Sequence, residues 1–192
     1  FDTTGPKSIY GFCKYSSEHL IREFSFFNKT KYIINRCGVI SGPWQFGKED
    51  QGFVSLWVWK HLNKKKMNYI GFGGKGSQIR DVIHIEDICK LIFLQIKKIN
   101  NINNLTVNVG GGIKNAISLK KLTKICQKIT SNKIKISSIA NTSEYDIPHY
   151  ITDNSKVKKI YGWLPEKKFI QIVKDLNFWM LKNKKTLKKY II

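Results

Sequence analysis

Short β-rich runs alternate with longer amphipathic segments along this sequence, and that alternation limits the fold more than any other feature. Apolar residues recur at helical spacing over residues 9–27, and a β-rich run over 31–39 follows and ends before Gly42-Pro43. The same order returns as a helical segment over 85–99 and then a parallel-type strand over 105–109. The sequence therefore predicts an α/β fold with a partly parallel sheet.

The other elements are shorter or lie toward the C-terminus. Apolar spacing predicts helices over 51–62, 118–130 and 166–183, and a short strand over 68–71. The last helix has Phe169, Val173, Leu176 and Met180 in register, which predicts one apolar stripe. The glycine-rich residues 71–76 predict a turn, because glycine alone tolerates so many positive φ angles.

Composition excludes several classes of protein. Hydrophobic residues make up 42% of the 192, which is typical of a globular chain and argues against disorder. The net charge of +21 would ordinarily suggest a nucleic-acid partner. Only Arg22, Arg36 and Arg80 are arginine, however, and the lysines are scattered along the chain, so we attribute the charge to compositional bias and expect no nucleic-acid partner.

We also expect no membrane partner and no metal. No apolar run approaches the roughly 18 residues that span a bilayer. The four cysteines lie far apart without ligand spacing, so we expect reduced thiols in a cytoplasmic protein. Residues 1–6 resemble neither a signal peptide nor a start at an initiator methionine, so we expect the chain to begin at an internal cut.

Tyr10 and Lys14 stand four residues apart at the start of the first predicted helix, so their side chains share one face. A tyrosine with the ordinary pKa of about 10 is a poor base at neutral pH. A neighbouring positive charge favours the phenolate, which can then accept a proton from a hydroxyl group. The pair alone favours a surface lysine over a packed tyrosine, and only the rest of the sequence favours the chemical interpretation.

Further motifs follow the pair in a recognisable order. They are Arg36-Cys37 with Gly42-Pro43-Trp44-Gln45, the RDxxHxxD element from Arg80 to Asp87, Asn108-Val-Gly-Gly111, the segment from Asp146 to Asp153, and Tyr161-Gly-Trp-Leu-Pro165. Together with Tyr10-x-x-x-Lys14 they resemble the extended short-chain dehydrogenase/reductases, the NAD-dependent epimerase/dehydratase family that acts on nucleotide sugars. The resemblance covers nearly the whole chain.

The resemblance implies the C-terminal half of a Rossmann-type fold with a smaller mixed α/β substrate-binding lobe. Residues 1–45 would end the dinucleotide-binding domain, 46–84 would form an insertion of the substrate lobe, 85–110 would return to the Rossmann sheet, and 111–192 would form the C-terminal lobe. The family's glycine-rich phosphate loop, ribose-binding acid and catalytic Ser/Thr would then precede Phe1. The resemblance also implies a homodimer of the complete protein.

The same resemblance assigns site residues. Tyr10 and Lys14 would be catalytic and, with Cys37 and Val39, would contact NAD. The nucleotide-diphosphate sugar would be bound by Gln45, Gln51, Arg80 and Asp146. Arg80 suits a diphosphate because its planar fork matches phosphate oxygens, and the plainer alternative is an ion pair with Asp81 or Glu86. Val39 and Ser143 stand where many relatives have Asn and Arg, which indicates different substrate handling.

Within the family, residues 36–52 and 69–74 are most similar to the CDP-paratose 2-epimerase group, so a CDP-sugar is the favoured ligand. NAD would take hydride from C2 of the sugar and return it to the opposite face. The isolated fragment would be inactive. A 4,6-dehydratase or 4-epimerase of the same family and a non-catalytic nucleotide-sugar-binding module remain as alternatives. For His84 we favour a role in fixing the local turn over a titrating role in the site.

Overall fold

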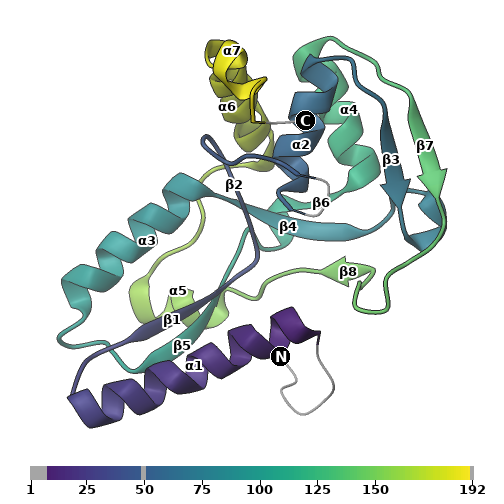
Figure 1. Cartoon of the computed structure of the whole chain (residues 1–192). Coiled ribbons are helices and arrows are strands. Elements are labelled where there is room, and N and C mark those ends of the chain that lie inside the picture. The colour runs from purple at the N-terminus through teal and green to yellow at the C-terminus, as the bar shows by residue number, and fades with distance from the viewer. Residues whose placement is uncertain (1–7, 49–50, 191–192) are drawn as a thin grey trace.

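The computed structural model describes residues 8–48 and 51–190, and its first layer is a parallel strand pair between helices (Figure 1). Strands β1 (Ile33–Cys37) and β5 (Leu105–Val109) run parallel in register from Ile33 opposite Leu105 to Cys37 opposite Val109. Helix α1 (Ile9–Asn28) lies on one side of the pair. Helices α3 (Ile85–Lys98) and α5 (Ser155–Tyr161) cover the other side.

A second sheet forms around β4 (Ile79–His84). Strand β2 (Val39–Ser41) pairs with it in parallel, β6 (Ala116–Ser118) pairs antiparallel, and β8 (His149–Tyr150) pairs in parallel with its first residues. The sequence did not predict β4, β6 or β8, and the predicted run over 31–39 reaches only the first residue of β2. Consecutive buried residues give β4 no alternation of polar and apolar positions, and its motif residues are charged.

The single β-rich run predicted over 31–39 is in fact two strands that belong to different sheets. The change of sheet occurs at Gly38, whose N–H donates to the Val109 carbonyl at 2.9 Å. A Cβ at this position would lie 2.8 Å from the Thr152 hydroxyl, so the bend is crowded and suits glycine. The prediction of one strand was wrong here because period-2 patterning does not reveal a change of sheet.

Three helices pack around one core at the top of Figure 1: α2 (Phe53–Leu62), α4 (Leu119–Thr130) and α6 (Phe169–Lys182). Beside them β3 (Met67–Ile70) runs parallel to β7 (Ile136–Ile139). The apolar stripe predicted on the last long helix is confirmed, because Phe169, Val173, Leu176 and Met180 are all buried. Other members of this core are Val54, Val58, Leu122 and Ile172.

Short turns complete the chain: η1 (Phe72–Gly74), η2 (Ile113–Asn115) and the single-turn helix α7 (Lys184–Leu187). The turn predicted over 71–76 is confirmed, with φ of 80° at Gly71 and 71° at Gly73. The helices predicted over 9–27, 51–62, 85–99, 118–130 and 166–183 are also confirmed, each within about three residues of its observed ends.

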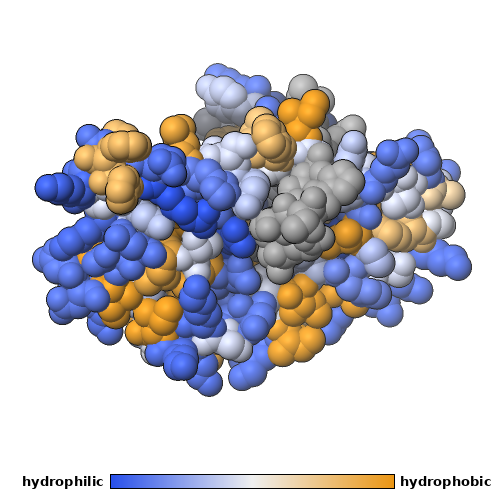
Figure 2. All heavy atoms as spheres, turned by 90° about the horizontal axis from the view of Figure 1, so that it is seen from below, coloured by the Kyte–Doolittle hydropathy of each residue, from blue (hydrophilic) through white to orange (hydrophobic). Residues whose placement is uncertain are grey.

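Helix α1 packs with its polar side toward the strands and leaves most of its apolar residues exposed. Ser25 is its only buried residue among those described, whereas Leu20 and Phe27 are 71% and 75% exposed. Figure 2 views the molecule from below, the side on which α1 lies, and shows hydrophobic residues in clusters among hydrophilic ones. In the described chain, β1 pairs with β5 alone, so its other edge carries no strand.

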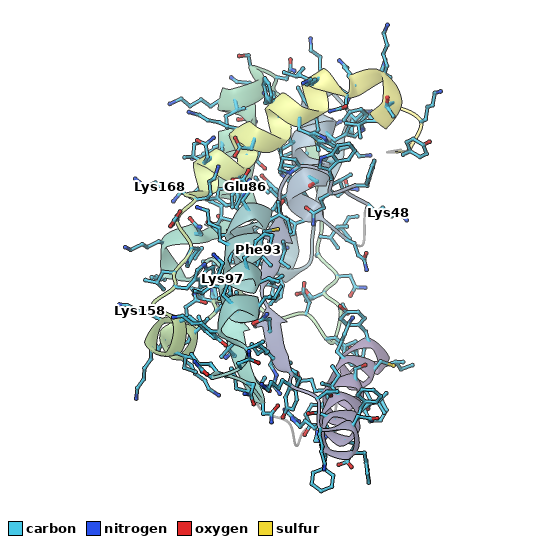
Figure 3. All side chains as sticks on the ribbon, turned by 90° about the vertical axis from the view of Figure 1, so that its left-hand side faces the viewer. Lys48, Glu86, Phe93, Lys97, Lys158 and Lys168 are labelled. Carbon is cyan, nitrogen blue, oxygen red and sulfur yellow. The ribbon has the colours of Figure 1, made fainter. Side chains whose placement is uncertain are left out.

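The outer side of α3 carries Phe93 and Lys97, and Lys158 and Lys168 lie on the same side of the molecule (Figure 3). The lysines labelled in this view therefore come from several different elements. Among the helices of the described residues, none combines the length and the hydropathy needed to cross a lipid bilayer.

Candidate active site

Tyr10 and Lys14 lie in the first two turns of α1, as predicted. The helix begins after Ser8, whose hydroxyl accepts the Gly11 N–H at 3.1 Å and so caps the exposed first turn. The Lys14 ammonium lies 5.5 Å from the centre of the Tyr10 ring. Tyr10 is 69% exposed, so its phenol is open to a ligand.

An ion pair ties α1 to β1 and so positions this tyrosine and lysine. Glu18 accepts two hydrogen bonds from Arg36, each of 2.7 Å, and a third from Arg22 at 3.3 Å. The Arg36 guanidinium holds the pKa of Glu18 below its ordinary value, despite partial burial. Arg36 immediately precedes Cys37, so this contact fixes the helix relative to the end of β1, where Cys37 is exposed.

Asp81 is a buried residue that links three segments of the chain, and sequence reasoning did not single it out. Its carboxylate accepts the Gly112 N–H at 2.8 Å and the Thr152 hydroxyl at 3.2 Å. It thereby joins β4 to the loop after β5 and to the segment after β8. The charge is fully buried, so these two donors satisfy it where water cannot. The motif had drawn attention to Arg80, and nothing in its pattern marked the next residue as the buried one.

Arg80 and Asp146 come together, although they are 66 residues apart in the sequence. One terminal nitrogen of Arg80 donates to the Asp146 carboxylate and to the Ile147 carbonyl, and the other donates to the Ile79 and Pro148 carbonyls. The plainer alternative for Arg80, an ion pair with Asp81 or Glu86, is wrong, because its partner is Asp146. The prediction that both residues bind a ligand stays a prediction.

Gln45 lies in the loop between β2 and α2, and its side chain holds that loop together. Its carbonyl oxygen accepts the hydroxyls of Ser41 at 2.9 Å and Ser55 at 2.8 Å, and its amide donates to the Ile40 carbonyl at 2.9 Å. Gln51 is exposed at the other end of the loop. These contacts give Gln45 an internal role, and ligand contact by either glutamine stays a prediction.

We expect Gln45→Ala to lower the free energy of unfolding by about 1–3 kcal/mol, because it leaves partly buried hydroxyl and carbonyl groups without partners. Urea denaturation of the variant checks this value. Gln51→Ala is the matched control and should change the free energy by less than about 0.5 kcal/mol, because Gln51 is exposed. Equal losses for the two variants would contradict the role given to Gln45.

His84 fixes the start of α3, which agrees with the interpretation favoured from the sequence. Its Nδ1 accepts the Glu86 N–H at 3.0 Å, and its Nε2 lies 3.4 Å from the Asp175 carboxylate. Burial lowers the pKa of His84, which favours the neutral ring that this cap requires. Among the described residues, no group of three His, Cys, Asp or Glu side chains could hold a metal ion.

Apart from Gln45 and Gln51, which lie in the loop before α2, the predicted site residues fall into three groups. Tyr10 and Lys14 share the start of α1, Cys37 and Val39 flank the change of sheet at Gly38, and Arg80 and Asp146 are in contact. Within the described chain, no hydrogen bond or ion pair joins one group to another. A hollow of about 470 Å³ at the far end of α1, lined by Arg22, Lys29, Asn104 and their neighbours, includes none of the predicted site residues.

The family model and the similar proteins of known name point to the same family. The model of the NAD dependent epimerase/dehydratase family matches residues 1–110. CDP-paratose 2-epimerase of Salmonella typhi is 26% identical over 161 residues, which are 83% of this chain and 47% of that protein. A dTDP-glucose 4,6-dehydratase of Escherichia coli is 26% identical over 189 residues, which are 93% of this chain and 50% of that enzyme. The chain thus spans about half the length of these relatives.

The fold has close counterparts among solved structures. UDP-glucose 4-epimerase of Thermotoga maritima, solved with UDP-glucose, superposes with a TM-score of 0.80 at 24% identity, over 94% of this chain and 55% of that one. UDP-glucose 4-epimerase of Thermus thermophilus, solved in complex with NAD, gives 0.79 at 17% identity over 94% of this chain and 57% of its own. These matches confirm the predicted α/β fold of the Rossmann type.

Proposed function

We propose a function for this chain on the premise that it belongs to the NAD dependent epimerase/dehydratase family. We infer that it carries the catalytic tyrosine and the nucleotide-sugar lobe of an NAD-dependent nucleotide-sugar epimerase. The observation that carries this proposal is the exposed Tyr10 with the Lys14 ammonium 5.5 Å from its ring, at the capped start of α1. An exposed phenol beside a cation is suited to proton transfer with a bound hydroxyl.

The proton step would fall to Tyr10, which would accept the proton of a sugar hydroxyl and later return it. Lys14 would hold the nicotinamide ribose through its ammonium group. NAD, when bound, supplies the hydride acceptor that makes oxidation and re-reduction of one sugar carbon possible. Arg80 would orient the substrate by its diphosphate, because its fork can pair with two phosphate oxygens.

The residues present suit one end of NAD. Tyr10 and Lys14 offer hydroxyl and ammonium donors for the nicotinamide ribose, and Cys37 and Val39 lie where the chain crosses between sheets. The sequence contains no G-x-x-G-x-x-G turn that joins a strand to a helix, and the glycines of 71–76 lead into η1 and β4 instead. The pyrophosphate of NAD would therefore need residues other than those of this sequence.

The division into domains follows from this proposal. Residues 1–45 and 85–110 would belong to the dinucleotide-binding domain, and 46–84 and 111–192 would form the lobe that holds the nucleotide sugar. Residues 1–7, 49–50 and 191–192 of these ranges lie outside the described chain. The parallel pairing of β1 with β5 supports the first assignment, and the joint core of α2, α4 and α6 supports the second.

We favour a CDP-sugar with epimerisation at C2. The similarity of residues 36–52 to CDP-paratose 2-epimerases supports this choice, and so does the relative from Salmonella typhi. A 4,6-dehydratase is the second candidate, because dTDP-glucose 4,6-dehydratases match the chain at the same identity over a larger share of it.

A substrate assay separates these candidates. The protein expressed from its complete reading frame is incubated with NAD and either CDP-paratose, UDP-glucose or dTDP-glucose, and the products are identified by NMR. We expect the 2-epimer of CDP-paratose. A 4-epimer or a 4-keto-6-deoxy product would select a sibling activity, and ligand binding without any product would favour the non-catalytic binding module.

A further inference from the structure

Arg80 has little free capacity for a new ligand. Both terminal nitrogens are engaged, with three backbone carbonyls at 2.7–3.4 Å and with the Asp146 carboxylate. A guanidinium offers five N–H donors, of which four belong to these two nitrogens. A diphosphate that pairs with Arg80 through both terminal nitrogens must therefore displace at least one existing partner.

Asp146 is the partner that can leave. The Ile79 carbonyl belongs to β4, and the Ile147 and Pro148 carbonyls lie just before β8, whose pairing with β4 holds that backbone in place. The Asp146 contact depends on a side chain that is 38% exposed and can rotate. Asp146 also carries the only negative charge among the four partners, so an incoming diphosphate would repel it and leave the neutral carbonyls undisturbed.

We propose that Asp146 is an internal anion that occupies the diphosphate position on Arg80 and competes with the nucleotide for it. This inference rests on the proposed function, in which Arg80 binds a nucleoside diphosphate. Asp146 thereby lowers the affinity for that ligand and keeps Arg80 paired while the site is empty. Its role differs from direct substrate binding, which the family resemblance implied for the same residue.

The substitution Asp146→Asn tests the proposal with little change in shape. Asparagine keeps the oxygen that accepts both the Ile147 N–H and the Arg80 hydrogen bond, so the local turn is preserved and only the negative charge is removed. Glu144→Gln is the matched control, because it removes one negative charge from the same exposed segment and Glu144 is not an ion-pair partner of Arg80. Each variant is made in the protein expressed from its complete reading frame, and CDP, UDP and dTDP are titrated by calorimetry.

We expect Asp146→Asn to bind the preferred nucleoside diphosphate roughly two- to fivefold more tightly than the unmodified protein, the range expected for removing a partly exposed ion pair. Glu144→Gln should leave the affinity unchanged within about a factor of 1.5. In an Arg80→Gln background the gain from Asp146→Asn should disappear, because Asp146 and the diphosphate then no longer compete for Arg80. The double variant also covers the case in which Asp146→Asn alters folding, because a change in affinity caused by altered folding would persist without Arg80.

Three results overturn the proposal, and they can be told apart. Weaker binding by Asp146→Asn would make Asp146 a ligand of the nucleotide. An equal gain from Glu144→Gln, or a gain that persists in the Arg80→Gln background, would mean that the tighter binding comes from the lower net negative charge of the segment and not from release of Arg80. If the unmodified protein binds none of the three nucleotides, the proposed function itself fails, and the role of Asp146 fails with it.

Discussion

Replacing Tyr10 by phenylalanine should lower kcat by roughly 10²–10⁴-fold and leave the affinity for the nucleotide sugar nearly unchanged, because it removes the proton-transferring group and keeps the ring. The Lys14 ammonium and the ring would remain in contact, so the start of α1 should keep its shape. The measurement is steady-state turnover of the preferred nucleotide sugar by the protein expressed from its complete reading frame, together with calorimetric titration of the same ligand.

Tyr32→Phe is the matched control for this experiment. Tyr32 follows α1 at its opposite end and lines the hollow that contains no predicted site residue, so loss of its hydroxyl should leave turnover unchanged. Normal turnover by Tyr10→Phe would show that Tyr10 takes no part in the chemical step. Equal losses in the two variants would indicate damage to the helix and no specific role for Tyr10.

Gly111→Ala should strongly destabilise the fold, by about 3 kcal/mol or more. A Cβ at Gly111 would lie 2.1 Å from the Val82 carbonyl oxygen, which belongs to β4 and cannot move without breaking the sheet. The neighbouring Gly112 donates to Asp81, so the same shift would disturb the buried carboxylate. In thermal melting this loss corresponds to a decrease in Tm of roughly 6–12 °C.

Gly162→Ala separates crowding from backbone conformation. Gly162 has a φ of 67°, and nothing lies within 4 Å of a Cβ placed there. Its substitution should lower the free energy of unfolding by only about 1 kcal/mol, the cost of holding alanine in the left-handed conformation. If Gly162→Ala proved as harmful as Gly111→Ala, close packing of the loop after β5 against β4 would not be the cause of the larger loss.

Sequence reasoning succeeded where one element carries a complete periodic signal. The apolar stripe of α6 predicted both the helix and its buried residues, and the glycines at 71 and 73 predicted a turn that requires positive φ. The spacing of Tyr10 and Lys14 likewise predicted their contact, because residues four apart on a helix are neighbours whatever the rest of the fold does.

It failed where the decisive contact joins distant segments. The pairing of Arg80 with Asp146 spans 66 residues, and the two donors of Asp81 come from Gly112 and Thr152, so no local pattern could reveal either set. Strand β4 was missed because it is largely buried and carries charged motif residues. Helix α1 was predicted correctly, but the outward orientation of its apolar residues was not. Helical spacing alone does not say which face of a helix packs against the strands.

The coding DNA upstream of Phe1 tests the central claim most directly, because an NAD-dependent enzyme of this family needs a phosphate-binding turn that this chain does not supply. We predict an in-frame segment that encodes a strand, a G-x-x-G-x-x-G turn and the start of a helix. A start codon immediately before Phe1 would contradict the account, because the chain would then have no turn for the pyrophosphate of NAD and could act only as a binding module or with a partner.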